Sequence, residues 1–145
     1  MYETILIATD GGDRAAVEHG LELAALSGAT VHALYVIETN AHYVFTAAGH
    51  DPETMAEFRE YGTGIVEDVV DRAVAKGLDG NGAVRAGSVA REVVDYATQQ
   101  EIDCIVVGAT GPRGIDNYLI GNTTQRVVRT SPVPVTTVRH RDSCY

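Results

Sequence analysis

The 145-residue sequence has few cysteines, and no long apolar run. Cys104 lies inside a short apolar run and Cys144 is the penultimate residue, and neither has the spacing of metal ligands. This usage indicates a reducing compartment and a core that needs no disulfide. No apolar stretch approaches the roughly 18 residues of a membrane span, and Met1 leads directly into a predicted strand without a signal-peptide pattern. We therefore expect a cytoplasmic protein with no membrane partner.

Basic residues are also scarce. Lys and Arg total 11 against 20 Asp and Glu, which gives a net charge of −9, and Lys76 is the single lysine. So acidic a surface disfavours nucleic acid as a partner. An acid-rich, lysine-poor surface is typical of a protein kept soluble in high salt, where repulsion is screened over a few ångströms. We expect a halophilic source, with an ordinary acidic protein as the alternative; urea titrations at low and molar KCl distinguish the two.

Three catalytic or cofactor motifs are missing. The sequence has no G-x4-G-K-[ST] loop, which excludes a P-loop NTPase, and Thr9–Gly12 lacks the dinucleotide fingerprint G-x-G-x-x-G. It also has no G-x-S-x-G elbow, and its five histidines are scattered without ligand spacing. No residue stands out as a general base. We therefore do not expect an enzyme, beyond at most a slow ATPase.

Short β-branched runs alternate with helical segments along the chain. This alternation predicts an α/β fold with a single doubly wound five-stranded parallel sheet, a flavodoxin- or Rossmann-like open sheet with helices on both faces. We expect one domain over residues 1–141 and a tail over 142–145. The predicted strands are Thr4–Thr9, Thr30–Ile37, about Asn81–Ala86, Ile102–Val107 and Val133–Val138. The predicted helices run from an N-cap at Asp13 to about Ser27, from Pro52 to about Lys76 with Gly62 and Gly64 weakening or kinking the middle, over Ala90–Gln100 and over Thr123–Arg129.

Gly108, Gly111 and Gly121 form the spacing G-x2-G-x9-G between an apolar strand and a predicted helix. Glycines let the backbone approach an anion closely, and the free N–H groups at the start of the following helix attract it. In doubly wound sheets, ligands bind beyond the carboxyl ends of the strands where the strand order reverses. If the first and fourth strands flank that point, the turn at Asp10 faces the glycine loop. The sequence therefore predicts a nucleotide site.

The chain resembles the universal stress protein family over essentially its full length. The segments that carry the resemblance are Ile5–Gly12, Leu34–Glu38, Ala86–Val94, Gly108–Gly111, Gly121–Val128 and Ser131–Val135. The family's motif, G-x2-G-x9-G-[ST], separates its ATP-binding members from those that bind no nucleotide. The resemblance implies ATP as the ligand, with AMP or ADP as alternatives, and Mg²⁺ accompanying the phosphates.

By this resemblance, Asp10 and the backbone around Val36 contact adenine and ribose, while the three glycines and the residues after Gly121 hold the phosphates. The full predicted set is Thr9, Asp10, Val36, Val107, Gly108, Gly111, Gly121, Asn122, Thr123 and Thr124. One position departs from the family pattern, because Asn122 stands where the family has Ser or Thr. Asn is a good helix cap with an amide that can donate to an anion, and we expect Thr123 and Thr124 to compensate for the lost hydroxyl.

Each site residue also has a plainer interpretation: Asp10 can serve only to cap the first helix, and the glycines can be turn-formers alone. The resemblance further implies a homodimer that pairs Val133–Val138 as an edge strand. The leading hypothesis is a small ATP-binding stress-response protein, a nucleotide sensor or regulator. The alternatives are a nucleotide-free dimerisation or interaction module, and a subunit that binds another adenine cofactor such as FAD.

Overall fold

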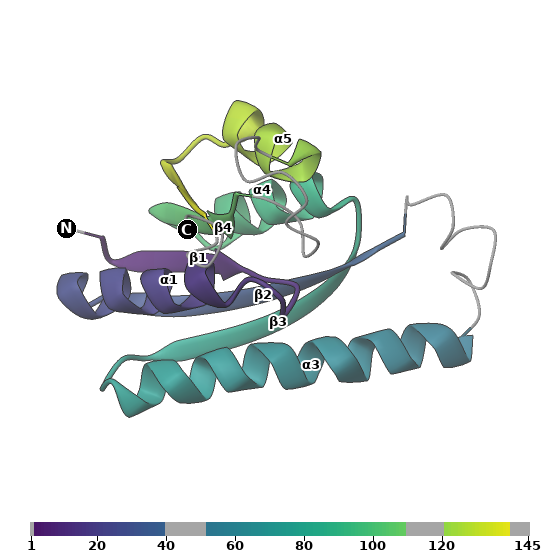
Figure 1. Ribbon diagram of the computed structural model, residues 1–145, viewed down its shortest axis with the longest axis horizontal. Helices are drawn as coiled ribbons and strands as arrows, with labels where there is room; N and C mark the ends of the chain where they lie inside the picture. The colour runs from purple at the N-terminus through teal and green to yellow at the C-terminus, as the bar shows by residue number, and fades with distance from the viewer. Residues whose placement is uncertain (1, 40–51, 110–120, 140–145) are drawn as a thin grey trace.

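The computed structural model describes residues 2–39, 52–109 and 121–139. Within them, five strands alternate with four helices, as predicted (Figure 1). The strands are β1 (Thr4–Ala8), β2 (Thr30–Glu38), β3 (Gly80–Gly87), β4 (Cys104–Gly108) and β5 (Val135–Val138). The helices are α1 (Arg14–Ser27), α3 (Pro52–Ala75), α4 (Val89–Gln99) and α5 (Asn122–Thr130). None of these helices is long and apolar enough to cross a membrane. The predicted boundary between domain and tail lies outside the described residues.

All five strands are parallel and lie in the order β3-β2-β1-β4-β5. The predicted doubly wound fold is confirmed. β1 occupies the centre, where Ile5 aligns with Val31 of β2 on one side and with Cys104 of β4 on the other. The chain winds outward from β1 in one direction and then from β4 in the other. The strand order therefore reverses between β1 and β4, where a ligand crevice is expected.

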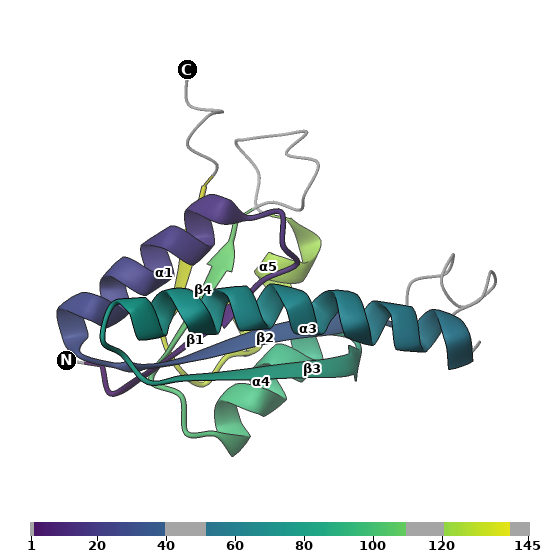
Figure 2. The same ribbon diagram turned by 90° about the horizontal axis from the view of Figure 1, so that it is seen from below.

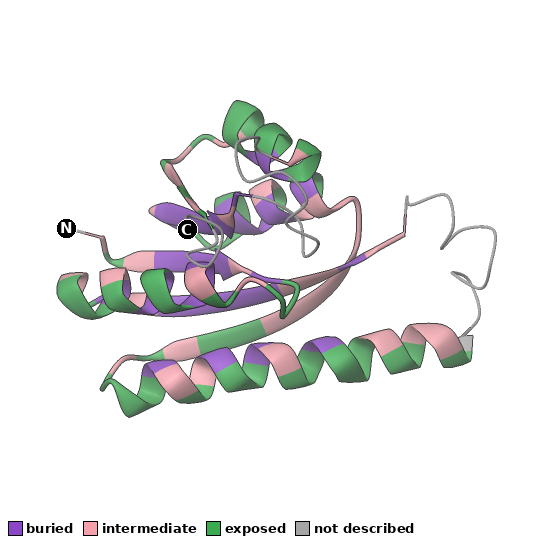
Figure 3. Cartoon of the chain, viewed as in Figure 1, coloured by how far each residue is buried: buried purple, intermediate pink, exposed green. Residues whose placement is uncertain are grey.

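Helices cover both faces of the sheet. α1 and α3 pack on one face, and α4 and α5 pack on the other (Figure 2). Successive residues of β1 point to opposite faces, so Ile5 and Ile7 join the core beneath α1 and α3 while Leu6 joins the core beneath α4 and α5. All three side chains are fully buried, and burial is concentrated in the central strands (Figure 3). A strand buried on both faces explains why the sequence shows continuous apolar runs.

Two strands begin two residues later than predicted. β5 begins at Val135 rather than Val133, because Pro134 has no N–H and contributes only its carbonyl oxygen, which accepts a hydrogen bond from the Ile105 N–H at 2.9 Å. β4 begins at Cys104 rather than Ile102, whose N–H instead donates to the carbonyl oxygen of Ala97 at the end of α4. Both strands are therefore shorter than the predicted segments.

The expected kink of the long helix at its glycines is absent. α3 continues as one helix from Pro52 to Ala75, through both Gly62 and Gly64 (Figure 2). Gly62 is buried against the ring of Tyr35, and a Cβ atom there would lie 2.4 Å from Tyr35 Cδ1. Gly62 therefore permits close packing of α3 on β2 rather than a bend.

Candidate functional site

A cavity of about 280 Å³ lies beyond the carboxyl ends of β1, β2 and β4. It occupies the predicted crevice, where the turn after β1 meets the start of α5. Nine of the ten predicted site residues line it: Thr9, Asp10, Val36, Val107, Gly108, Gly121, Asn122, Thr123 and Thr124. The tenth, Gly111, lies outside the described residues. The topology thus brings together residues that are more than 100 positions apart in the chain.

The apolar wall of the cavity was missed by the sequence reasoning. Leu34 from β2, Val89 and Val93 from α4 and Val127 from α5 line it together with Val36. The helical periodicity of the sequence could have identified the two residues of α4, because Val89 and Val93 are four residues apart and lie on one helix face. These side chains form an apolar slot between the sheet and two helices, suited to a flat ring.

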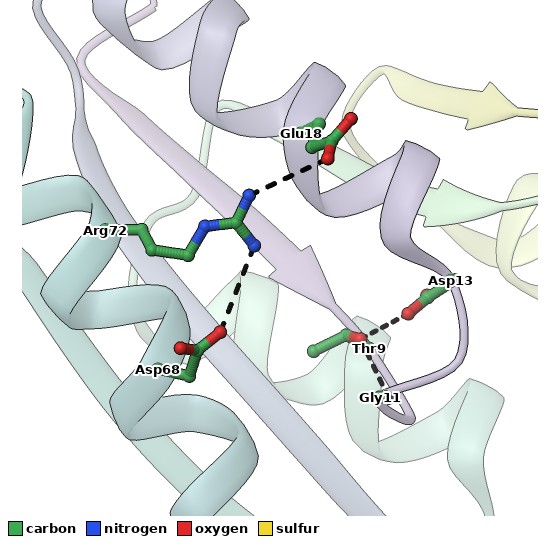
Figure 4. A network of polar contacts seen from close by, with 6 residues as sticks. All are labelled: Thr9, Gly11, Asp13, Glu18, Asp68 and Arg72. Carbon is green, nitrogen blue, oxygen red and sulfur yellow. Dashed lines mark hydrogen bonds and ion pairs between the residues drawn. The ribbon is translucent and has the colours of Figure 1, made fainter.

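The turn after β1 is held by side-chain hydrogen bonds (Figure 4). The Thr9 hydroxyl accepts a hydrogen bond from the Gly11 N–H at 3.0 Å and donates one to the Asp13 carboxylate. Asp10 Oδ1 accepts from the Gly12 N–H at 2.8 Å. Asp10 therefore closes its own turn and does not cap the first helix, while its exposed carboxylate stays at the mouth of the cavity.

Asp13 also differs from its expected role. It stands at the N-cap position of α1, but its carboxylate makes no capping hydrogen bond and bonds Thr9 instead. Burial raises the pKa of this carboxyl group, and the negative charge of Asp10 raises it further, against the lowering effect of the Thr9 hydrogen bond. The cavity thus holds two neighbouring carboxyl groups, one exposed and one half-buried.

The opposite side of the cavity is the start of α5. The first hydrogen bond of this helix joins the Gln125 N–H to the Gly121 carbonyl oxygen at 2.9 Å, so the N–H groups of Asn122, Thr123 and Thr124 precede the helical ladder. The Gly121 N–H donates to the Ala109 carbonyl oxygen at 2.8 Å. This bond ties the helix start to the end of β4. The positive end of the helix dipole therefore lies at the cavity wall, where it favours an anion.

Two expectations about this helix start need correction. Gly121, not Asn122, is the N-cap residue, and Asn122 is the first residue of the helix. Thr124 is buried, and its hydroxyl donates to the Gly108 carbonyl oxygen at 2.7 Å, so that hydrogen cannot also be donated to an anion. Thr123 is exposed and lines the cavity. We therefore expect Thr123, rather than Thr124, to offer a hydroxyl in place of the one that the family has at position 122.

The described part of the chain contains no group of three or more His, Cys, Asp or Glu side chains arranged to hold a metal ion. Asp10 and Asp13 are the acidic residues that line the cavity. Chemically, the site offers an apolar slot, two carboxyl groups and a helix N-terminus within one space.

The sequence profile of the universal stress protein family matches residues 1–139. The chain belongs to this family. It is 30% identical over 148 residues to a universal stress protein of Methanothermobacter thermautotrophicus, covering 96% of this chain and 97% of the relative. It is 29% identical over 141 residues to universal stress protein MJ0531 of Methanocaldococcus jannaschii, covering 96% of this chain and 83% of the relative.

Solved structures show the same fold. Protein MJ0577 superposes with a TM-score of 0.85 at 23% identity, over 97% of this chain and 98% of that one. A universal stress protein in complex with cAMP gives a TM-score of 0.71 at 24% identity, over 94% and 97% of the two chains. The universal stress protein of Archaeoglobus fulgidus in complex with dAMP gives 0.65 at 18% identity, over 94% and 97%.

Proposed function

We propose that this universal stress protein is a small ATP-binding regulator, with AMP or ADP as alternative ligands. The observation that carries the proposal is the strand-end cavity, where an apolar slot, a carboxylate and a helix N-terminus lie within one space. An adenine nucleotide needs these three environments for its base, its ribose and its phosphates. The proposed role is binding, with at most a slow ATPase activity.

The arrangement of charge orients the nucleotide. Adenine lies in the slot formed by Leu34, Val36, Val89 and Val93, and the ribose hydroxyls donate to Asp10. The phosphates lie at the start of α5, because the carboxyl groups on the β1 side would repel them. Universal stress proteins solved in complex with cAMP and dAMP support an adenine nucleotide as the ligand. The proposal that the ligand carries further phosphates is based on the spacing of Gly108, Gly111 and Gly121 in the sequence.

Mg²⁺ would arrive with the phosphates. This ion is usually bound by one or two carboxylates together with phosphate oxygens and water, rather than by an all-protein cage. Asp10 and Asp13 line the β1 side of the cavity, across from the proposed phosphate position, so phosphate oxygens and water at the start of α5 would supply most of the ligands of the ion.

The first experiment is mass spectrometry of the small molecules released when the natively purified protein is denatured, followed by calorimetric titration with ATP and Mg²⁺. Gly121→Val is the test variant, because Gly121 has an extended backbone (φ −62°, ψ 155°) that valine adopts readily, while the new side chain narrows the phosphate end. Stoichiometric adenine nucleotide, or micromolar binding lost in Gly121→Val, supports the proposal. An empty site with no heat at several temperatures favours a nucleotide-free interaction module.

Assembly as a homodimer through β5 is the second part of the proposal. β5 lies at the edge of the sheet, and among the described strands it pairs with β4 alone. The carbonyl oxygens of Pro134 and Val138 accept hydrogen bonds from the β4 side, so by alternation Val135 and Thr137 present their backbone groups at the outer edge. Thr137→Pro removes an outward N–H and should shift the protein towards monomer in sedimentation, whereas Thr137→Val keeps it. An unchanged dimer in Thr137→Pro would reject this edge as the interface.

We also propose that the protein works in a cytoplasm of high salt concentration. The net charge of −9 supports a cytoplasm of high salt concentration, where the acidic surface is screened. The test is the comparison of urea titrations at low and molar KCl, in which a halophilic protein loses stability as the salt is withdrawn. Equal stability at both concentrations would reject the halophilic origin.

A further inference from the structure

A second cavity lies on the other face of the sheet. It is a groove of about 760 Å³ between α1 and α3, open along one side and separate from the strand-end cavity except at Thr9, which lines both. Figure 4 looks into this region, with Arg72 reaching from α3 towards α1 and the Thr9 turn beside it. Nothing in the nucleotide proposal uses this groove.

The floor of the groove is apolar. Val17 of α1 and Val69 of α3 are 5% and 2% exposed, and Ile65 lies beside them. Tyr61 borders the groove and is 58% exposed. Gly64 faces the open space, because a Cβ atom there would meet no atom within 4 Å. The groove can therefore accept a branched aliphatic or aromatic side chain.

The charged groups at the rim differ in their pairing. Arg72 pairs with two carboxylates, Glu18 at 4.0 Å and Asp68 at 3.9 Å (Figure 4). Arg14 of α1 and Glu60 of α3 also line the groove at exposed positions, and within the described ranges neither forms an ion pair. One cationic and one anionic group therefore border the apolar floor from different helices without neutralising each other.

We propose that this groove binds a free α-amino acid with an apolar side chain. The carboxylate of the ligand pairs with the Arg14 guanidinium, its ammonium group pairs with Glu60, and its side chain lies on Val17, Ile65 and Val69. A zwitterion with an apolar side chain matches one guanidinium and one carboxylate above an apolar floor, whereas a simple anion would be repelled by Glu60 and a simple cation by Arg14.

The position of the groove gives this ligand a route to the nucleotide site. Gly11 lines the groove and lies against Ile65, since a Cβ atom on Gly11 would be 2.8 Å from Ile65 Cδ1. The Gly11 N–H also donates to the Thr9 hydroxyl, which in turn donates to Asp13 in the strand-end cavity. A ligand seated on Ile65 therefore contacts the turn that holds Asp13. Binding at one site should change the affinity at the other by the same factor in both directions.

The test is titration of the full chain with L-leucine, followed by calorimetry and by amide chemical shifts, in the absence of added nucleotide. Two probes isolate the charged groups: 4-methylpentanoate lacks the ammonium group, and isopentylamine lacks the carboxylate. We expect leucine to bind, and each probe to bind about tenfold more weakly or worse, the effect of losing one charge-assisted contact. Equal binding of all three, or no binding of leucine at tens of millimolar, would overturn the proposal.

Variants locate the binding. Arg14→Gln and Glu60→Gln should each weaken leucine binding about tenfold. Gly64→Leu should abolish it by filling the groove while the melting temperature holds or rises, because Gly64 lies inside a helix and faces open space. Arg91→Gln, at an exposed position of α4 on the other face of the sheet, is the charge-matched control and should leave binding unchanged. Binding that survives Gly64→Leu would place the amino acid elsewhere.

Coupling has its own readout, the affinity for ATP with and without saturating leucine. A changed Kd for ATP that reverts in Gly64→Leu supports the route through Ile65 and Thr9, and an unchanged Kd would overturn it. Because leucine binding is measured first without nucleotide, the amino acid site is tested even if the nucleotide proposal fails.

Discussion

The Thr124 hydroxyl donates a 2.7 Å hydrogen bond to the carbonyl oxygen of Gly108. This contact joins the first turn of α5 to the last residue of β4, across a segment of chain that includes the glycine loop. Since both ends of that segment border the strand-end cavity, the bond fixes the distance between the helix N-terminus and the strand end. It is a structural contact within the proposed phosphate region.

Replacing Thr124 by valine should weaken both the fold and nucleotide binding. Valine keeps the shape but removes the donor, which leaves the Gly108 carbonyl oxygen without this partner at a cost of about 1 kcal/mol in the free energy of unfolding. The start of α5 is then less well held, so the affinity for ATP should fall as well. Urea titration and calorimetry measure the two effects separately.

Thr123→Val is the matched control. Thr123 is exposed, and its loss should change the free energy of unfolding by less than about 0.5 kcal/mol, while ATP affinity falls if its hydroxyl meets a phosphate. If Thr124→Val left the stability unchanged and Thr123→Val lowered it, the assignment of these two hydroxyls would be reversed.

The half-buried carboxyl group of Asp13 makes a different prediction, that its removal stabilises the protein. Its pKa is raised in the folded state, mainly by burial, so the ionised form costs folding free energy at neutral pH. Asp13→Asn should raise the free energy of unfolding at pH 7 by on the order of 0.5–1 kcal/mol, the size of a typical single stabilising substitution. Urea titrations of both proteins from pH 7 to pH 3 check it.

The stabilisation by Asp13→Asn should depend on pH. A group whose folded pKa lies above its unfolded value costs nothing below the unfolded value, here about 3.8, and the cost develops as the pH rises through the folded pKa. The advantage of Asp13→Asn should therefore shrink as the pH falls towards 3.8. Asp10→Asn, at an exposed position, should change stability by less than about 0.5 kcal/mol. A destabilised Asp13→Asn at pH 7 would contradict the argument.

The sequence was sufficient to predict the fold because β1 and β4 are apolar runs buried on both faces, and because β-branched segments alternate with helical patterns along the chain. It also predicted most of the cavity, since the switch point follows from the strand order once β1 and β4 are neighbours. The apolar wall was not predicted. Val89 and Val93 were placed at the start of a helix or just before it, but the face that they present to the cavity depends on how α4 packs on β2.

The hydrogen-bond and packing partners of individual side chains also could not be predicted from the sequence. Asp13 has the residue type and position of an N-cap, yet Thr9 lies close enough to take its carboxylate, and this depends on the turn geometry rather than on local preference. In the sequence, Gly62 and Gly64 look alike, as two glycines inside one predicted helix. In the structure, Gly62 lies against the ring of Tyr35, whereas a Cβ atom on Gly64 would meet nothing within 4 Å. A sequence pattern cannot separate a glycine required by packing from one that faces open space.

The two glycines of α3 provide a matched pair of substitutions. Gly62→Ala places a methyl group 2.4 Å from Tyr35 Cδ1, and overpacking of this kind costs about 1–3 kcal/mol. Gly64→Ala meets nothing within 4 Å and should stabilise the helix by about 0.5–1 kcal/mol. Thermal or urea unfolding of the two variants should therefore give opposite signs. Stabilisation by both would mean that α3 can move away from β2 at little cost.

A buried histidine contacts α4 about one helical turn beyond Val93 of the cavity wall. His32 of β2 is 8% exposed, and its Nδ1 lies 2.7 Å from the hydroxyl oxygen of Tyr96 on α4. The Arg85 guanidinium lies 4.8 Å above the Tyr96 ring, which adds positive charge to the neighbourhood. Burial lowers the pKa of His32 below its usual 6.5, so the folded protein favours the neutral ring.

This histidine should make the protein less stable in mild acid. Above about pH 6.5 the ring is neutral in both states and costs nothing; below it the unfolded chain takes up a proton that the folded state resists. The free energy of unfolding should then fall with a slope of at most about 1.4 kcal/mol per pH unit, the value for one proton. His32→Gln should remove this slope in urea titrations between pH 8 and pH 5, whereas His19→Gln, at an exposed position of α1, should keep it. A slope that persists in His32→Gln and disappears in His19→Gln would show that the exposed histidine, not the buried one, links folding to protons.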